Sequence, residues 1–267
     1  MLRKLLKYEF KATARTMIPL YMVLILFSLF HLIVNPFALL ESSSNSTLQT
    51  ILGILDIFLY LALIVGVAII TFVIMIQRFY KSLLGDEGYL MFTLPARTWQ
   101  LIISRLLIAM LWSITSYLVT IGSVIIISRV PNLFGTIGEI IKVFRQILGI
   151  GGFFTVPIYL LASLASGGLL IYAAIALGHL LPKYRGLASF GMYIVLYMAS
   201  QAILSLTMVL VSKMYDTNLN TIDTITDLTS PGRLNLSILL FTLTVFIIVA
   251  ACFTITNLIL KKRLNLD

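Results

Sequence analysis

The chain contains little charge, almost no cysteine or histidine, and few prolines. Of its 267 residues, 11% are charged, one is Cys, two are His and seven are Pro. Soluble domains carry about 25% charged residues, and a soluble chain of this length could not keep 60% hydrophobic residues away from water. A single cysteine, Cys252, excludes an intrachain disulfide and a Cys-based metal site. The composition therefore predicts an integral membrane protein.

The sequence also lacks the motifs of several enzyme classes. It has no G-x-x-x-x-G-K-[ST] stretch, so we expect no ATP site of its own, and it has no H-E-x-x-H zinc motif. The two histidines, His31 and His179, lie far apart in the sequence, and each is expected to pack in the protein or at an interface. We therefore predict that the chain is not an enzyme and binds no metal or cofactor.

The stretch LASGG, residues 164–168, partly matches the G-x-S-G nucleophile motif of intramembrane serine proteases, but Leu164 stands where the motif begins with glycine. His179 follows Ser166 by 13 residues, about 20 Å along one helix, whereas a nucleophile and its base must approach within about 3 Å. No feature places His31 nearby. We favour helix packing by small residues, which form two small-xxx-small pairs. These are Ser163 with Gly167 and Ala174 with Gly178.

Six apolar runs are long enough to cross a bilayer, which takes about 20 helical residues. They are residues 17–34, 51–76, 101–128, 153–181, 187–211 and 236–260. Helices satisfy their own backbone hydrogen bonds in lipid. The tight turn PKYRG, residues 182–186, separates the fourth run from the fifth. We therefore predict an all-α fold with six transmembrane helices in a single domain, 1–267, without a separate soluble domain.

The basic residues give the chain its net charge of +9 and predict its orientation. If the six runs cross in turn, 14 of the 19 Lys and Arg residues fall on one side of the membrane. These are Arg3, Lys4, Lys7, Lys11, Arg15, Arg78, Lys81, Arg97, Arg105, Lys183, Arg185, Lys261, Lys262 and Arg263. The other side has Arg129, Lys142, Arg145, Lys213 and Arg233. Cytoplasmic loops carry the excess of Lys and Arg, so both termini are predicted to be cytoplasmic, and no nucleic-acid partner is expected.

Two further segments have the periodicity of amphipathic helices. In residues 1–15, MLRKLLKYEFKATAR, the apolar residues lie near one helical face, which is typical of an interfacial helix on the inner leaflet. A loose basic tail held by anionic lipid is the alternative. In the segment 129–152, apolar residues recur at i, i+3, i+4 and i+7 from Ile137. This segment is predicted to be an external amphipathic helix, which rests on the outer leaflet or packs on the bundle.

Two acidic features remain. The segment 212–235 contains three Asp residues and is predicted to be a water-exposed external loop. Asp56 is the single acidic residue within an apolar run, where a carboxylate at the bilayer centre costs about 2.5–3.5 kcal/mol. Asp56 lies close to the start of its run, so it can sit near the outer interface at lower cost. We favour a helix-start residue that reaches the headgroups over a polar contact in a substrate path.

The cytoplasmic segment 77–100, QRFYKSLLGDEGYLMFTLPARTWQ, is predicted to form a short helix, a turn and a second short helix. Gly85 is a helix stop, Asp86 can cap the next helix, and Pro95 ends it. A lipid-facing elbow would explain the aromatic residues of this segment, but it explains less well two adjacent carboxylates that face an anionic leaflet. A protein partner in the cytoplasm explains both.

The run LLGDEGYLMFTLPARTWQLIISRLL, residues 83–107, resembles the loop between the second and third helices of the small ABC-2-type permeases of Gram-positive bacteria. The six-helix layout, the basic N-terminal helix and the chain length also agree with that family. The resemblance is close over about 25 residues and loose over the whole chain. The polar segment 212–235 departs from the family, which often has a short apolar re-entrant hairpin before its last helix.

The resemblance implies a permease subunit of an ATP-binding cassette exporter in the plasma membrane of a Gram-positive bacterium. A separate ATPase subunit would bind ATP and Mg²⁺. It would hold a coupling helix made of Gly85, Asp86, Glu87, Gly88, Tyr89, Leu90, Met91 and Phe92. Two permease subunits, identical or different, would act with two ATPase chains among membrane lipids, on an amphipathic or lipophilic cargo such as a peptide, drug or lipid-like molecule. The alternative is a stand-alone secondary transporter or channel.

Overall fold

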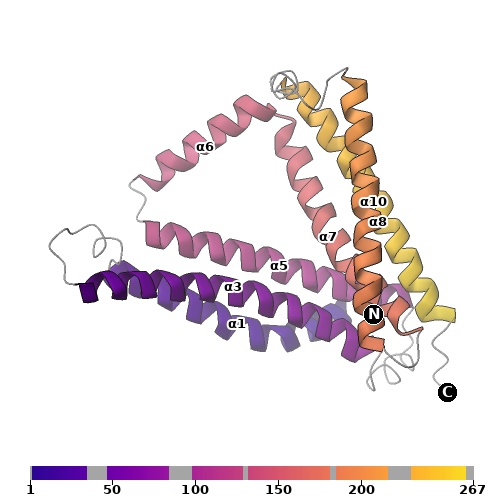
Figure 1. Ribbon diagram of the computed structural model, residues 1–267, viewed down its shortest axis with the longest axis horizontal. Helices are drawn as coiled ribbons and strands as arrows, with labels where there is room; N and C mark the ends of the chain where they lie inside the picture. The colour runs from indigo at the N-terminus through magenta and orange to yellow at the C-terminus, as the bar shows by residue number, and fades with distance from the viewer. Residues whose placement is uncertain are drawn as a thin grey trace. The chain divides into compact units, whose positions relative to one another are not determined.

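The computed structural model describes residues 2–34, 47–83, 98–128, 132–180, 185–215 and 230–262, and these residues form seven α-helices. In chain order the helices are α1 (Leu2–Val34), α3 (Thr47–Leu83), α5 (Thr98–Ser128), α6 (Leu133–Leu148), α7 (Gly152–Gly178), α8 (Arg185–Met214) and α10 (Pro231–Lys262) (Figure 1). No β-strand occurs in the described ranges, so the all-α prediction is confirmed.

Six of these helices are long and apolar enough to cross a membrane, as the sequence predicts for the six apolar runs. The exception is α6, with 16 residues. The composition and the six helices give the chain the character of a multi-pass membrane protein. The 37 residues of α3 span about 55 Å at 1.5 Å per residue, compared with about 30 Å of hydrocarbon in a bilayer. The helix α3 is therefore longer than the hydrocarbon layer is thick.

Two segments that were predicted to be separate short helices are parts of longer ones. Residues 2–15 join the first predicted span in the single helix α1, which continues through Pro19. Residues 77–83 belong to α3. Neither junction contains a glycine that could stop the helix. A transmembrane helix also tolerates a proline, because neighbouring groups can satisfy the carbonyl oxygen that loses its N–H donor. The position of residues 2–15 on the membrane surface stays a prediction.

Two other predicted elements are present, and a third has different bounds. The fourth and fifth apolar runs form two helices, α7 and α8, rather than one. The helix predicted within 129–152 is α6. The predicted polar loop at 212–235 is shorter than expected, because α8 extends to Met214 and α10 starts at Pro231.

The chain divides into two compact units, and each is described by itself. The first consists of Met1–Arg78 and Leu107–Leu133, so it contains α1, most of α3 and the second part of α5 (Figure 1). The buried side of α1 repeats every three or four residues, as expected for one face of a helix. It consists of Thr13, Met17, Tyr21, Leu24, Ser28 and His31. Since lipid tails are as apolar as the side chains, van der Waals packing and hydrogen bonds hold such helices together.

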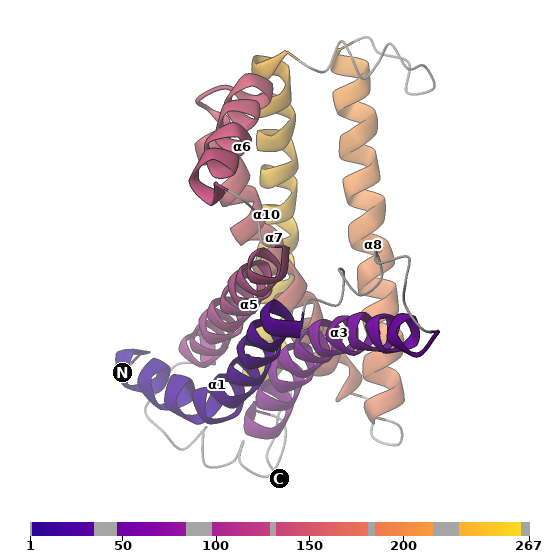
Figure 2. The ribbon, with the colours of Figure 1, turned by 90° about the vertical axis from the view of Figure 1, so that its left-hand side faces the viewer.

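The second unit consists of Phe79–Leu106 and Phe134–Asp267. Its central helix is α7, which packs against both α8 and α10 (Figure 2). Several buried residues of α7 are alanines, namely Ala162, Ala173, Ala174 and Ala176. Small residues let neighbouring helices approach closely. A contact between Thr207 Oγ1 and Thr244 Oγ1, 3.0 Å apart, links α8 to α10.

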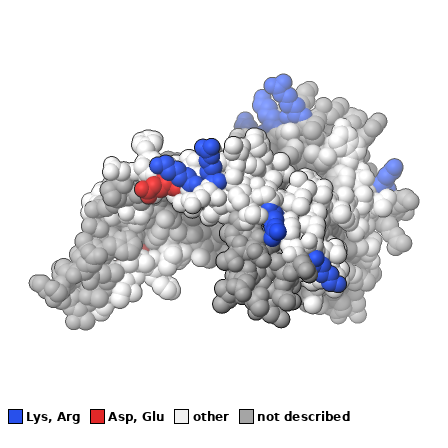
Figure 3. Space-filling model, turned by 90° about the horizontal axis from the view of Figure 1, so that it is seen from above, with Lys and Arg blue, Asp and Glu red and all other residues white. Residues whose placement is uncertain are grey.

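Charged side chains are sparse on the described surface. Figure 3 shows the Lys and Arg side chains on one face as separate patches among uncharged atoms. Within the first unit, Arg78 Nη1 lies 3.9 Å from Glu9 Oε2. This pair is partly exposed, and such pairs contribute little to stability.

Candidate functional site

The coupling segment, residues 85–92, lies outside the described residues, but both of its flanks are described. The helix α3 ends at Leu83 and α5 begins at Thr98. Near the end of α3, Phe79 stacks on Tyr172 of α7, with ring centroids 3.9 Å apart and ring planes at 7°. The two residues are 0% and 1% exposed. The end of α3 is therefore packed on the C-terminal half of α7.

The next residue of α3 extends this contact. The ring of Tyr80 lies 5.2 Å from the ring of His179, with the ring planes at 53°. His179 directly follows α7, and its backbone N–H donates to the carbonyl oxygen of Ile175 at 3.1 Å. Tyr172 and His179 are two helical turns apart. The two contacts with α3 are therefore separated by roughly 10 Å along the axis of α7. His179 packs against an aromatic ring, as predicted from the sequence.

The flank after the coupling segment is joined to α10. Thr98 Oγ1 donates to Asn257 Oδ1 at 2.7 Å. The next turns of α5 are buried, with Ile102 at 0% and Arg105 at 4% exposed. A buried guanidinium is costly in an apolar environment unless other groups interact with it.

None of these flanking contacts was predicted from the sequence. The signals that could have found them are modest. Phe79 and Tyr80 are adjacent aromatic residues at the end of an apolar run, and Asn257 is a polar residue inside the last run. Polar residues in membrane helices usually bond to a neighbouring helix, but the sequence does not show which one.

Asp56, the candidate for a polar contact in a substrate path, pairs with His31. His31 Nε2 lies 3.3 Å from Asp56 Oδ2, and the side chains are 1% and 18% exposed. His31 also contacts the rings of Phe27 and Tyr60, at centroid distances of 5.0 and 5.4 Å. Asp56 is not a helix-start residue, because α3 begins nine residues earlier at Thr47. We favoured an Asp56 side chain that reaches the headgroups, and that prediction did not include His31 as its partner.

Further polar contacts join the three helices of the first unit. They are Tyr60 Oη to Ser123 Oγ (2.8 Å), Tyr21 Oη to Ser116 Oγ (2.6 Å), Ser116 Oγ to Thr71 Oγ1 (2.9 Å) and Trp112 Nε1 to Thr13 Oγ1 (2.7 Å). In hydrocarbon, polar groups must find partners within the protein. Together with the His31–Asp56 pair, these contacts form a polar seam along the first unit.

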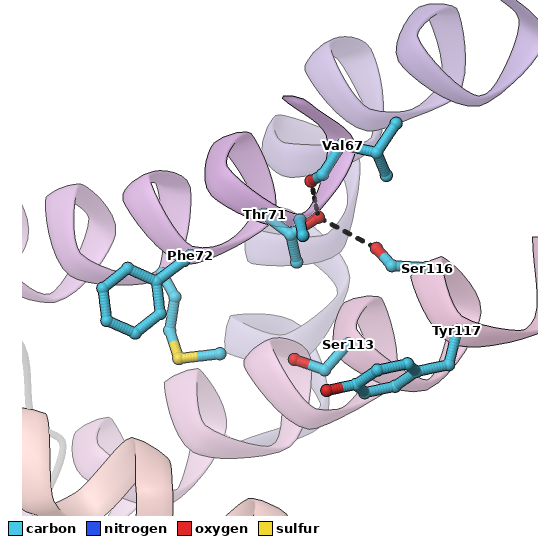
Figure 4. Close-up of a pocket in the computed structure, with 8 residues that line it drawn as sticks. Val67, Thr71, Phe72, Ser113, Ser116 and Tyr117 are labelled. Atoms are coloured by element: carbon cyan, nitrogen blue, oxygen red, sulfur yellow. Dashed lines mark hydrogen bonds between the residues drawn. The ribbon is translucent and has the colours of Figure 1, made fainter. Parts of the chain in front are cut away.

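A small cavity lies beside the polar seam, between α3 and α5 (Figure 4). Its volume is about 140 Å³, and its lining consists of Val67, Ala68, Thr71, Phe72, Met75, Ser113, Ser116 and Tyr117. Thr71 Oγ1 donates to the carbonyl oxygen of Val67 at 2.8 Å and lies 2.9 Å from Ser116 Oγ (Figure 4). The cavity therefore combines apolar walls with hydroxyl groups, of which those of Thr71, Ser113 and Ser116 already have partners.

The four residues predicted to pack helices have different surroundings. A Cβ atom built on Gly178 would lie 2.5 Å from the Cα of Ser189, so α7 and α8 approach closely there. Ala174 is buried. Gly167 is exposed, and a Cβ atom there would meet nothing within 4 Å. Ser163 Oγ donates to a carbonyl oxygen of its own helix. Among the described residues, close approach is therefore found at Gly178 and not at Gly167.

The described residues contain no group of three or more His, Cys, Asp or Glu placed to hold a metal ion. Comparisons with protein family models, with curated proteins and with solved structures gave no match to this chain. A functional proposal therefore depends on the sequence of the coupling segment, on the contacts of its flanks and on the polar seam.

Proposed function

We propose that this chain is the membrane-spanning subunit of an ATP-binding cassette exporter, in which residues 85–92 couple it to a separate ATPase subunit. The sequence GDEGYLMFTLP, residues 85–95, carries the proposal. It connects two helices, α3 and α5, that are long and apolar enough to cross a membrane. Its carboxylates, Asp86 and Glu87, suit a basic groove, and aromatic residues such as Tyr89 supply buried contact area.

The contacts at the flanks support this role because they join the helix ends on both sides of the coupling segment to α7 and α10. Phe79 and Tyr80 pack on α7, and Thr98 is hydrogen-bonded to α10. Packed helices shift between discrete arrangements rather than deform continuously. A displacement of the coupling segment would therefore be passed to α7 through its first flank and to α10 through its second.

In the proposed exporter, two permease subunits, identical or different, act with two ATPase chains at the plasma membrane. ATP and Mg²⁺ bind to the ATPase chains. Closure of the ATPases moves the coupling segment, and the flanks pass this movement to the helices. The permease chain supplies the path for the cargo, and its residues take no part in ATP hydrolysis.

We propose an amphipathic or lipophilic cargo. Binding pockets in proteins are typically apolar, with a few polar groups that orient the ligand. The cavity of the first unit has this character, since Phe72 and Met75 line it together with the hydroxyl residues Ser113 and Tyr117. At about 140 Å³, it is large enough for one part of a peptide, drug or lipid-like molecule.

A stand-alone secondary transporter is the second candidate, and one observation favours it. The buried His31 lies 3.3 Å from the partly exposed Asp56 in the apolar part of the chain, where ionisable residues often mark ion or proton pathways. Such a transporter would work without an ATPase. The purified chain, reconstituted alone in vesicles, would then move cargo in response to a pH gradient, whereas the exporter would require the ATPase and ATP.

Copurification tests the coupling role. The tagged full-length chain is extracted from its native membrane, and the bound ATPase is measured at equal amounts of permease. Reversal of Asp86 and Glu87 to Lys should lower ATPase binding about tenfold or more, because tenfold corresponds to about 1.4 kcal/mol and reversed contacts become repulsive. Membrane insertion should persist, since added Lys in a cytoplasmic loop obeys the positive-inside rule. Glu139→Lys on the exposed surface of α6 is the matched control.

Joint replacement of Tyr89 and Phe92 by Ala tests the apolar part of the contact. This variant should also lose the ATPase, because it removes the buried contact area while it keeps both carboxylates. A lipid-facing elbow gives a different expectation, since added Lys would be neutral or favourable near anionic headgroups. Unchanged ATPase binding by both double variants would contradict the coupling role.

A further inference from the structure

The helix α6 is amphipathic, and none of its residues is buried. Its apolar residues Phe134, Ile140 and Ile147 are 90%, 63% and 44% exposed. At 3.6 residues per turn, Lys142 and Gln146 fall on the side opposite to the apolar face. That face consists of Ile137, Ile140, Ile141, Phe144, Ile147 and Leu148. An exposed apolar surface of this kind marks an interaction site.

The direction of α6 is fixed by its junction with α7. Gly149 follows α6 with a φ of 65°, a conformation that suits glycine, and its N–H donates to the carbonyl oxygen of Arg145 at 2.8 Å. Asn235 of α10 closes the junction. Its Nδ2 donates to the carbonyl oxygen of Leu148 at 2.6 Å, and its Oδ1 accepts from Thr155 Oγ1 at 2.9 Å. The direction of α6 relative to α7 and α10 is therefore defined.

The neighbours of α6 in the chain place it at the membrane surface. It follows α5, the third candidate span, and precedes α7, the fourth. Only residues 129–132 and 149–151 connect it to these two helices. Connections of this length are too short to carry a 16-residue helix into bulk water. After three crossings, this surface is the membrane face opposite to the N terminus.

We propose that the apolar face of α6 is seated in the phospholipid headgroup layer on that side of the membrane. Amphipathic helices of this type bury their apolar face about 5–10 Å into the boundary between headgroups and acyl chains. Lipid runs along the whole length of the helix, about 24 Å, so it can cover the exposed residues of the apolar face. Lys142 and Arg145 can extend their charged ends to lipid phosphates. This proposal needs only the membrane-spanning character of the chain and not its coupling to an ATPase.

Spin-label accessibility tests the proposal on the full-length chain. Cys252 is replaced by Ala, and the chain is reconstituted in vesicles of phosphatidylcholine and phosphatidylglycerol. Single labelled cysteines are placed at Ile140 or Ile147, with Lys142 and Gln146 as matched positions on the polar face. Molecular oxygen is concentrated in lipid, and a nickel chelate is confined to water. The ratio of oxygen to nickel collisions should be several-fold higher at the two isoleucine positions than at the two polar positions.

Two outcomes would overturn the proposal. If Ile140 and Ile147 are shielded from both reagents, protein covers the face, supplied by a second copy of the chain or by another subunit. If nickel reaches all four positions equally, the helix lies in water. Since Ile140 and Ile147 are exposed, the label itself is not expected to prevent folding, and a single symmetric size-exclusion peak for each labelled chain checks this.

Discussion

Phe79 and Tyr172 stack face to face with ring centroids 3.9 Å apart, although they are 93 residues apart in the sequence. The stack joins the end of α3 to α7, the central helix of the second unit. Both residues are buried, with at most 1% exposed. Aromatic pairs contribute about 0.5–1.5 kcal/mol beyond their area burial. In the proposed exporter, this contact is the first through which a movement of the coupling segment would reach the helices.

Phe79→Ala should lower both stability and coupling. Truncation of a buried Phe costs roughly 3–5 kcal/mol through the cavity that it leaves, so the thermal midpoint in detergent should fall clearly. In a double-mutant cycle with Tyr172→Ala, the two effects should be non-additive by about 0.5–1.5 kcal/mol. ATPase activity of the assembled complex should respond less to cargo.

Phe58→Ala is the matched control for this experiment. Phe58 lies in the same helix but is 73% exposed, so its truncation should change the thermal midpoint little. Additive effects of Phe79→Ala and Tyr172→Ala would show that the stack contributes no specific interaction.

The small residues of α7 permit a second prediction. Their spacing alone suggests packing at both Gly167 and Gly178, but the structure distinguishes the two positions. Gly178→Ala should lower the thermal midpoint, because the new Cβ atom would lie 2.5 Å from the backbone N and Cα of Ser189. Gly167→Ala should be neutral or raise the midpoint, since Ala is favoured over Gly inside helices by roughly 0.5–1 kcal/mol.

Thermal unfolding of the two purified variants at equal detergent concentration measures this difference. A midpoint lowered equally by both changes would mean that Gly167 also makes a close contact, for example with a second copy of the chain. An unchanged midpoint for Gly178→Ala would mean that α7 and α8 separate easily at their junction.

The long apolar helices could be predicted from the sequence because length and hydropathy are local properties. The six runs correspond to six candidate spans, and the amphipathic period from Ile137 corresponds to α6. Helix ends were less predictable. The helix α1 starts at Leu2 and continues to Val34. The change from a basic to an apolar sequence near residue 16 does not end a helix, because no helix-stopping glycine lies there.

The polar contacts could not be predicted, because they depend on which helices are neighbours. Asp56 was visible as an isolated acidic residue, but its partner His31 lies on another helix. Hydroxyl side chains are common in membrane helices, and only the fold places the oxygens of Tyr21 and Ser116 2.6 Å apart. In lipid, apolar surfaces fit many neighbours almost equally well, so hydropathy does not select among them.

The predicted orientation can be tested with a membrane-impermeant thiol reagent. Cysteines placed at Ser43 and Thr221 should react when the reagent is added outside intact cells, because the excess of Lys and Arg assigns these segments to the exterior. Cysteines at Asp86 and Lys183 should react only after the cells are opened. All four positions lie outside the described residues, so this prediction comes from the sequence. The reverse pattern would place the coupling segment outside the cell, where no ATPase could reach it.

The His31–Asp56 pair allows a test that separates structure from transport. Removal of one partner from a close polar pair leaves the other group unsatisfied, at a cost of about 1–3 kcal/mol, whereas replacement of both by apolar residues of similar shape is often neutral. His31→Phe would keep an aromatic ring beside Phe27 and Tyr60, but it would leave Asp56 unpaired. We expect a lowered thermal midpoint, by an amount near the low end of that range because the Asp56 side chain is 18% exposed.

The double change His31→Phe with Asp56→Leu should restore the thermal midpoint, because it removes both ionisable groups at once. If the pair only holds α1 to α3, this variant should keep ATP-driven transport in the assembled complex. If the pair belongs to a proton pathway, the variant should be stable yet unable to transport, because no ionisable group remains at that position. Thermal unfolding and vesicle transport, measured on the same preparation, distinguish these results. A stable double variant without transport would favour the secondary transporter over the exporter, and a double variant less stable than His31→Phe alone would show that the pair is not the unit that stabilises this contact.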